Sequence, residues 1–324
     1  MGKRKKFQVP LEERTIMSQK SNDFENHRFT YLVAQVLMGL PLTVLGFLVW
    51  CFNVIVLRRK PFGKFAGSLS LLELSPAIRG VRDGSAGWQA LHIIYNWYGH
   101  FGIKPDFPRD PFAWFWIKML NAQAVRNGLR IIVSELKKAI EAAAESDDEV
   151  RILSIASGSA QSLFLAIKAL ENEGFNKKVR LLLLDLDQTA LDHSVMLAER
   201  FRFPGSRIIS VTGSTNSVEE TINVNGFRPH IVEMAGFLDY RPDKKAMGLM
   251  SRIHSLLPPE GSFITCHIHP NIERHFLRWV LCWPMVYRSK DNFLRLVEAS
   301  AGWSVRDTTE PHGIHTVVVC TKKS

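Results

Sequence analysis

A single glycine stands in a turn of small residues, directly after an apolar run that is typical of a buried strand. The run covers residues 150–156, and Ser157, Gly158 and Ser159 follow it. Glycine allows a ligand to approach the backbone closely, because no Cβ is in the way. The N–H groups at the start of the helix that follows can bind a carboxylate. The turn is therefore a candidate site for the carboxylate end of a ligand.

Two carboxylates end the next apolar run, which covers residues 179–184. Asp185 or Asp187 can accept hydrogen bonds from both hydroxyls of a ribose, as the acid that ends the second strand does in dinucleotide-binding folds. The alternative is a pair of solvated acids that caps the next helix. The glycine turn, the order of the strands and a C-terminal hairpin together favour the ligand.

Strands that alternate with helices must position these residues. Near-continuous apolar strands between helices predict a parallel sheet that is covered on both faces, and the last two strands predict a hairpin that adds antiparallel edge strands. The predicted strands are 150–156, 179–184, 207–212, 230–235, 262–267, 303–308 and 316–321, and the predicted helices are 121–148, 163–172, 190–201 and 244–257.

The turn at Gly158 is not one of the two common phosphate-binding loops. A P-loop needs Gly-Lys-Ser/Thr after its glycines, and the segment SGSAQSL does not contain it. The dinucleotide fingerprint needs glycines at 158, 160 and 163, where the chain has Gly158, Ala160 and Leu163. Nucleoside triphosphates and NAD are therefore disfavoured.

Three segments carry a resemblance to a known family. ILSIASGSAQSL, LLLLDLDQTAL and WSVRDTTEPHGIHTVVVCTKK resemble a class I S-adenosylmethionine (SAM)-dependent methyltransferase. The resemblance implies an α/β fold over residues 149–324, with a Rossmann-like seven-stranded methyltransferase sheet and an antiparallel C-terminal hairpin. A helical cap over 62–148 would precede this domain.

The resemblance also implies SAM as the cofactor and the residues that hold it. Gly158 would lie against the methionine part, Asp185 would hold the ribose with Asp187 as the second candidate, and the residues after the third strand would border the adenine. The cofactor-binding residues implied in this way are Ser157, Gly158, Ser159, Asp185, Asp187, Thr212 and Gly213.

The chain departs from the family at three positions of this turn. The family's acid and outer glycines are replaced by Ser154, Ala156 and Ala160, so carboxylate recognition by that acid is absent. Arg126, on the helix before the first strand, either reaches the SAM carboxylate or belongs to an ordinary solvated helix face.

A narrower resemblance lies in the second half of the chain. AGFLDYRPD and CHIHPNIERHFLRWVLCWPMVYRS resemble bacterial proteins named for the biosynthesis of an extracellular factor, 3-hydroxypalmitic acid methyl ester. The acid before the Trp in those proteins appears here as Cys282. The resemblance makes a small or lipid-like acceptor with a carboxylate or hydroxyl an attractive prediction.

The candidate acceptor pocket follows the fifth strand, at the edge where open α/β sheets bind ligands. Arg288 is a candidate carboxylate clamp because its planar fork suits two oxygens. Each histidine has a plain alternative as a residue that stabilises a turn or the core. The histidine and cysteine spacing in 266–275 matches no standard zinc site, so we expect no metal. The candidate catalytic residues are His267, His269, Tyr240, Tyr287 and Arg288.

The N-terminal part carries most of the basic charge and one long apolar segment. Of the 41 Lys and Arg, eleven lie in residues 1–64, together with only four of the 31 Asp and Glu. The body therefore has no basic groove, and we expect no nucleic-acid partner. Residues 29–57 carry no charge, and the stretch 31–57 is about 40 Å long as a helix, against about 30 Å of hydrocarbon.

The sequence therefore predicts a basic tail over 1–28 and a membrane segment over 29–58. The segment is expected to be a single transmembrane helix, with a kink or a re-entrant turn at Gly39-Leu40-Pro41 as the alternative. The catalytic domain is expected to face the cytoplasm, where SAM is found. The predicted function is a membrane-anchored SAM-dependent methyltransferase. The alternatives are an inactive membrane scaffold or sensor with the SAM fold, and an NAD(P)-dependent oxidoreductase.

Overall fold

The computed structural model describes residues 24–26, 31–33, 35–59, 87–96 and 111–323. Apart from residues 24–26, the predicted basic tail 1–28 lies outside the described residues. So do residues 62–86 and 97–110 of the predicted helical cap.

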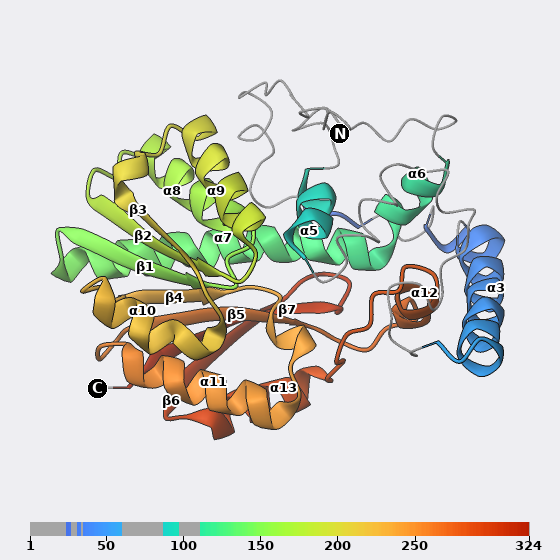
Figure 1. Cartoon of the computed structure of the whole chain (residues 1–324). Coiled ribbons are helices and arrows are strands. Elements are labelled where there is room, and N and C mark those ends of the chain that lie inside the picture. The colour runs from blue at the N-terminus through green and yellow to red at the C-terminus, as the bar shows by residue number, and fades with distance from the viewer. Residues whose placement is uncertain (1–23, 27–30, 34, 60–86, 97–110, 324) are drawn as a thin grey trace, which may run out of the picture.

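A seven-stranded sheet forms the centre of the molecule, in the order β3-β2-β1-β4-β5-β7-β6 (Figure 1). The first five strands are parallel, and β7 is antiparallel to both of its neighbours. This confirms the predicted sheet and hairpin with one refinement, because β7 is an interior strand and only β6 lies at the edge. The strands are β1 (Glu149–Ile155), β2 (Lys178–Asp185), β3 (Ile208–Thr212), β4 (Ile231–Met234), β5 (Ser262–Ile268), β6 (Trp303–Thr309) and β7 (His315–Lys322).

Helices cover both faces of the sheet, as the apolar strands predict. The central strands β1 and β2 have four consecutive buried residues each, because side chains on both faces meet a helix layer. One face packs on α7 (Leu120–Ser146), α8 (Gln161–Asn172) and α9 (Gln188–Arg200). The other packs on α10 (Val218–Val224), α11 (Asp243–Leu256) and α13 (Lys290–Ser300).

A second apolar layer lies beside the carboxyl ends of the parallel strands. It contains α5 (Trp88–Tyr95), α6 (Pro111–Lys118), α12 (Arg274–Trp279) and the first turns of α7. The long helix α7 begins in this layer and ends on the sheet, so that it joins the cap to the sheet domain (Figure 1).

The apolar N-terminal segment is a helix that spans Tyr31–Val56. It contains a π-helical stretch at Gln35–Gly39, α3 at Leu40–Cys51 and a second π-helical stretch at Phe52–Val56. The chain continues as a helix through Pro41, so it does not turn back as a re-entrant hairpin at this point. Its length and composition suit a membrane anchor or a signal sequence.

The approach of α7 to β7 depends on a glycine. A Cβ on Gly128 would lie 1.9 Å from Nδ1 of His315, which is buried. We expect Gly128→Ala to lower the free energy of unfolding by about 3 kcal/mol, because neither the helix nor the ring can move away in a close-packed layer. Urea unfolding followed by circular dichroism measures this.

Gly248→Ala on α11 is the matched control for that substitution, because nothing lies within 4 Å of its added Cβ. It is expected to raise the free energy of unfolding by up to about 1 kcal/mol, since alanine favours a helix over glycine. Equal effects of the two substitutions would contradict a packing role for Gly128.

Candidate functional site

A cleft of about 600 Å³ opens at the carboxyl ends of β1, β2 and β4, within the range of small-molecule sites. Its walls are the loops that follow β1, β2, β3 and β4, and α5 lies over it. The polar and glycine residues that line it are Gly87, Gly158, Asp185, Asp187, Gly213, Ser214, Thr215, Gly236, Tyr240 and Arg241.

The loop after β1 has a left-handed backbone at every second residue. The φ angles of Ala156, Gly158 and Ala160 are 52°, 54° and 50°. Two of the three residues are alanine, so the loop has this conformation without glycine at those positions. Left-handed alanine costs about 1 kcal/mol per residue. Such strain is retained where the shape of a loop matters to a ligand.

Asp185 fixes this loop and still offers hydrogen-bond acceptors to the cleft. Its Oδ2 accepts from the N–H of Gly158 at 2.8 Å, and its Oδ1 accepts from the N–H of Asp187 at 2.9 Å. A carboxylate has about four acceptor positions. Two therefore remain, which is the number that a pair of ribose hydroxyls needs.

Asp187 lies at the cleft, but its carboxylate caps α9. Oδ1 accepts from the N–H of Thr189 at 2.9 Å and from its hydroxyl at 2.7 Å. The helix-capping alternative therefore describes Asp187, and the ligand interpretation suits Asp185.

Of the other predicted cofactor residues around the cleft, one lines it and three do not. Gly213 lines the cleft, and its N–H donates to the carbonyl of Asp185 at 2.8 Å. Thr212 does not line it, and its hydroxyl donates to Gln188. Ser157 and Ser159 belong to the loop without lining the cleft.

Arg126 lies outside the cleft and binds a segment that precedes the apolar helix. Its Nε and one terminal nitrogen donate to the two carboxylate oxygens of Glu25 at 2.8 and 2.7 Å. Asn127 accepts from the N–H of Glu25 at 2.9 Å. Arg126 is therefore placed to hold the N-terminal segment on α7.

A buried carboxylate lies beside the position where the family's acid is absent. Ser154 on β1 pairs with Glu233 on β4 and donates a hydrogen bond of 2.5 Å to its carboxylate. The Ser162 hydroxyl lies 3.4 Å from its other oxygen. Burial raises the pKa of Glu233. Ser154 and Ser162 therefore hold a buried carboxylate on β4, the strand beside β1.

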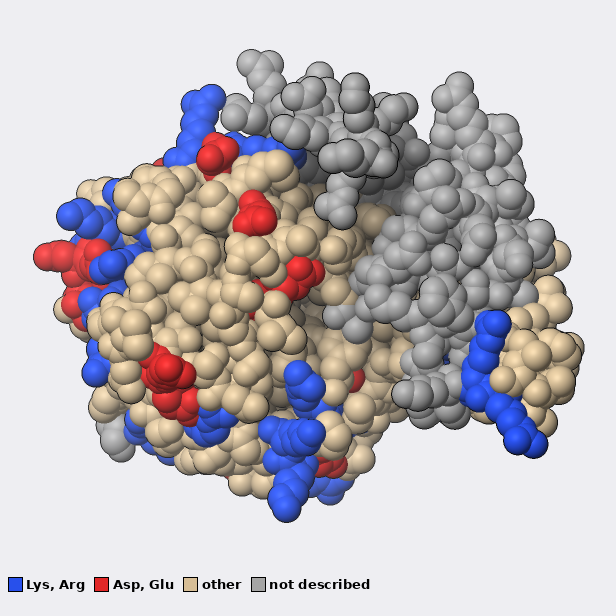
Figure 2. All heavy atoms as spheres, in the orientation of Figure 1, with Lys and Arg blue, Asp and Glu red and all other residues tan. Residues whose placement is uncertain are grey.

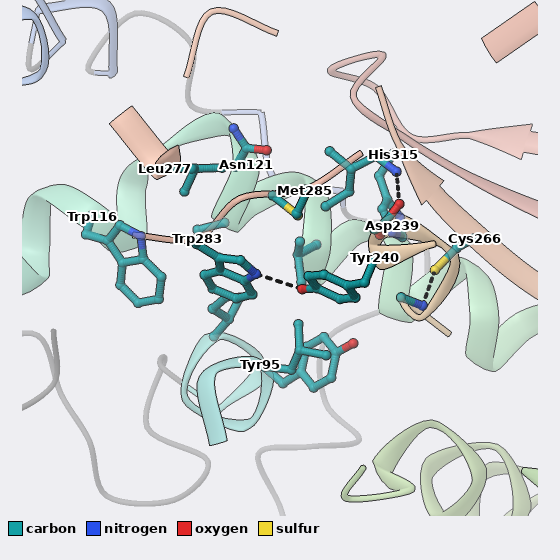
Figure 3. Close-up of a pocket in the computed structure, with 16 residues that line it drawn as sticks. Tyr95, Trp116, Asn121, Asp239, Tyr240, Cys266, Leu277, Trp283, Met285 and His315 are labelled. Atoms are coloured by element: carbon teal, nitrogen blue, oxygen red, sulfur yellow. Dashed lines mark hydrogen bonds between the residues drawn. The ribbon is translucent and has the colours of Figure 1, made fainter. Parts of the chain in front are cut away.

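A small apolar cavity of about 50 Å³ adjoins the cleft (Figure 3). Leu91, Gly236 and Tyr240 line both, so they separate the two spaces. The Tyr240 hydroxyl accepts from the indole N–H of Trp283 at 2.7 Å. The labelled aromatic and sulfur-containing residues around the cavity are Tyr95, Trp116, Tyr240, Cys266, Trp283 and Met285.

The two predicted catalytic histidines do not line this cavity. The ring of His267 lies with Nδ1 2.5 Å from Oδ1 of Asp239, and its Nε2 accepts from the backbone N–H of Arg288 at 3.0 Å. The ring of His269 lies 2.9 Å from the Arg288 carbonyl and 2.6 Å from the Thr316 hydroxyl. Both side chains are buried. Three of the four ring nitrogens are hydrogen-bonded, and Nδ1 of His267 lies against the Asp239 carboxylate, which matches the core alternative for each.

Arg288 and Tyr287 also lie outside the lining of the cavity. The Arg288 guanidinium donates to Asp243 at 2.8 Å, to the Leu238 carbonyl at 3.1 Å and to the Arg241 carbonyl. It therefore holds the loop after β4, and its fork is not open to a carboxylate from the cavity. The Tyr287 hydroxyl is buried without a hydrogen-bond partner among the described residues, and burial raises its pKa.

Two polar residues of the cavity were missed from the sequence. Asp239, next to Tyr240 in the AGFLDYRPD segment, accepts from the N–H of Ile268 at 3.1 Å. His315 stands at the start of β7, and burial lowers its pKa to about 4, so its ring is neutral near pH 7. In the described part of the chain no group of three or more His, Cys, Asp or Glu is arranged to hold a metal ion.

Comparison with known proteins finds the same fold at low identity. No protein-family model matches the chain, and no curated protein matches it. The structure of a possible exported protein from Bordetella parapertussis aligns with a TM-score of 0.64 and 14% identity, over 91% of this chain and 97% of that one.

Looser alignments include two methyltransferase structures. The magnesium protoporphyrin IX methyltransferase of Synechocystis PCC 6803 has a TM-score of 0.46 and 11% identity, over 63% of this chain and 87% of that one. The citrinin polyketide synthase CMeT domain has a TM-score of 0.48 and 12% identity, over 79% and 68%. The sheet order 3-2-1-4-5-7-6 with antiparallel β7 is the typical fold of class I SAM-dependent methyltransferases.

Proposed function

We propose that the chain is a SAM-dependent methyltransferase that acts on a small or lipid-like acceptor with a carboxylate or hydroxyl group. One observation carries the proposal. A polar cleft with Asp185 and Gly158 at its base adjoins an apolar cavity, and the two share a wall of three residues. The arrangement suits a nucleoside cofactor on one side and an apolar acceptor on the other.

The cleft residues fit SAM. Asp185 has the two acceptor positions that the ribose hydroxyls need. A Cβ at Gly158 would point toward α5, 3.4 Å from the Cβ of Trp88, so the glycine keeps a narrow passage open for the methionine part. Gly213 and Ser214 border the adenine end. Bound there, SAM supplies an activated methyl group.

The cavity residues suit an acceptor that is mostly apolar. The enzyme's main contribution to methyl transfer is to hold the acceptor oxygen in line with the methyl group. A carboxylate acceptor needs no base, whereas a hydroxyl acceptor benefits from one. The neutral His315 ring and the Asp239 carboxylate are the groups in the cavity that can accept a proton.

The apolar helix supports attachment to a membrane, with the cleft in the cytoplasm. A helix of 26 residues at 1.5 Å per residue is about 39 Å long, which is enough to reach across the hydrocarbon or to lie along it. The apolar lining of the cavity suits the apolar part of a lipid-like acceptor in the same membrane.

Calorimetric titration of SAM, S-adenosylhomocysteine and NAD into the full chain in detergent tests the cofactor. The full chain is used because the apolar helix packs on the body. We expect micromolar binding of the first two and none of NAD. Binding of NAD alone would support the oxidoreductase alternative. A folded chain that binds none of the three would support the scaffold alternative, which the replacement of the family's acid by Ser154 favours.

A further inference from the structure

The apolar helix contacts the body through a single stripe of residues. The members of this stripe lie three, four or seven residues apart, so they share one face of the helix. Tyr31, Gly46 and Asn53 are buried, and the others are partly buried against the apolar layer of α6 and α12. The stripe consists of Tyr31, Met38, Leu42, Gly46, Val49 and Asn53.

Close contacts hold this stripe against the body along its length. A Cβ on Gly46 would lie 2.8 Å from Cγ2 of Val280 and 3.2 Å from the carbonyl oxygen of Trp279. The Phe47 and Trp279 rings are 4.7 Å apart. Nearer the N-terminus, the Gln35 amide donates to the Glu273 carboxylate at 3.3 Å. The helix therefore lies flat on the body and does not project from it.

The opposite face carries large apolar side chains and is exposed. Apart from Phe47, twelve Leu, Val, Ile and Phe residues from Leu32 to Leu57 are exposed, and Leu37 and Ile55 reach 70%. The polar side chains of Tyr31, Gln35 and Asn53 face the body instead. This is the reverse of a surface helix in water, and an apolar face of this extent needs an apolar partner.

The position of α12 argues against a span across the bilayer. Its end packs on the middle of the apolar helix at Gly46, and its residues Arg274 and Arg278 are exposed. A helix that crossed the membrane would place these charged side chains in the hydrocarbon, where charge is costly.

Both flanks of the apolar helix are also tied to the same body. Before it, Glu25 is held on α7 by Arg126 and Asn127. After it, the chain returns to the body at α5. The indole N–H of Trp88, the first residue of α5, donates to the Thr189 hydroxyl at 3.1 Å. The sequence between residues 57 and 88 contains eight charged residues, so it offers no second apolar span.

We propose that this helix lies in the plane of one membrane leaflet, with its exposed face in the acyl chains and the body above it. The proposal rests on the proposed membrane attachment and differs from the predicted single span. Arg58 and Arg59 follow the helix and are exposed, which suits anionic headgroups at the same leaflet. Figure 2 shows basic side chains at the right edge of the molecule, beside an uncharged surface.

The position of the cavity fits this arrangement. Trp116, Leu277 and Trp283 line the cavity and belong to the same apolar layer on which the stripe packs. The cavity therefore lies one layer behind the leaflet-facing helix, and a lipid-like acceptor needs to cross only that layer to reach it.

Cysteine labelling on vesicles distinguishes lying in the leaflet from spanning it. Full-length Asn26→Cys, Arg59→Cys and Glu298→Cys are bound to sealed vesicles of phosphatidylcholine and phosphatidylglycerol and exposed to an impermeant maleimide. All three positions are exposed side chains, two flanking the helix and one on α13. Labelling of the native cysteines is measured in the parent chain and subtracted.

We expect both flanking positions to react as completely as position 298 before detergent is added. Protection of either flank until detergent opens the vesicles would show a span and overturn the proposal. A chain that does not float with the vesicles, or that pairs through this face as a stable dimer in place of binding them, would also overturn it. SAM is titrated into the same samples. A chain that binds SAM but gives one of these overturning results contradicts the membrane proposal alone, and a chain that lies in the leaflet but does not bind SAM contradicts the methyltransferase proposal alone.

The effect of a charged residue on the exposed face of the apolar helix is a second test, in which vesicle binding is measured. The double variant Leu37→Glu, Ile55→Glu is expected to bind these vesicles at least tenfold more weakly in a flotation assay. The matched control Val224→Glu changes an apolar side chain that is 79% exposed on α10, far from the stripe in sequence, and is expected to leave binding unchanged. Equal binding by the double variant and the parent would contradict the proposal.

Discussion

Replacing Asp185 by Ala is expected to weaken SAM binding by about 100-fold or more, measured by calorimetry. Two hydrogen bonds between a carboxylate and hydroxyls contribute roughly 1.5 kcal/mol each at least. The same substitution also removes the acceptor for the N–H of Gly158, so the loop after β1 loses its fixed position. Both effects act on the cleft, and the sheet beneath it stays intact.

Asp187→Ala is the control for Asp185→Ala. It removes the other carboxylate at the cleft, so it shows whether SAM binding depends on Asp185 in particular or on negative charge at this edge of the sheet. Its carboxylate accepts from Thr189 at the start of α9, so its loss is expected to lower the free energy of unfolding by about 1 kcal/mol. SAM affinity is expected to stay within about threefold of the parent. A large loss of affinity in Asp187→Ala, with none in Asp185→Ala, would reverse the roles of the two acids.

The sheet and the proximity of Gly158 to Asp185 were predictable because both depend on local features. The apolar run at 150–156 is buried on both faces, and the structure has β1 at Glu149–Ile155. Gly158 and Asp185 follow directly on consecutive parallel strands, so their proximity at one edge needs no knowledge of distant packing.

The acceptor side depended on side-chain direction, which the sequence leaves open. Successive residues of a strand point to opposite faces. On β5, Cys266 and Ile268 line the cavity, whereas the ring of His267 does not and stacks on Phe293 of α13. Neighbouring residues of β5 therefore lie in the cavity wall and in the core. Because both faces of the strand are buried, its sequence has no solvent-facing alternation that would show which residues face the cavity.

The arrangement of the N-terminal segment depended on contacts between distant parts of the chain. Glu25 and Arg126 are 101 residues apart, and neither has a pattern that predicts the other as its partner. The length and charge of 29–57 predict an apolar helix of membrane size. Only the structure shows that the end of α12, a helix with two exposed arginines, packs on the middle of the apolar helix at Gly46.

Gly158→Arg is expected to reduce SAM affinity by more than about 100-fold while the fold remains. The residue lines the cleft with φ +54°, and its added Cβ would lie 3.4 Å from Trp88 on α5. A Cβ alone is thus an ordinary contact, whereas a longer side chain must enter the cleft or displace α5. Either outcome closes the passage that we assign to the methionine part.

The loop itself indicates that the backbone tolerates such a change. Ala156 and Ala160 already have left-handed conformations two residues to either side, and the loop retains its shape with both. Gly158→Ala is therefore expected to cost only about 1 kcal/mol of stability and to weaken SAM binding by less than about tenfold. Thermal unfolding and calorimetry on both variants separate strain from obstruction. If the Ala and Arg variants lost SAM equally, backbone strain would be the cause, and the cofactor would not need to pass over Gly158.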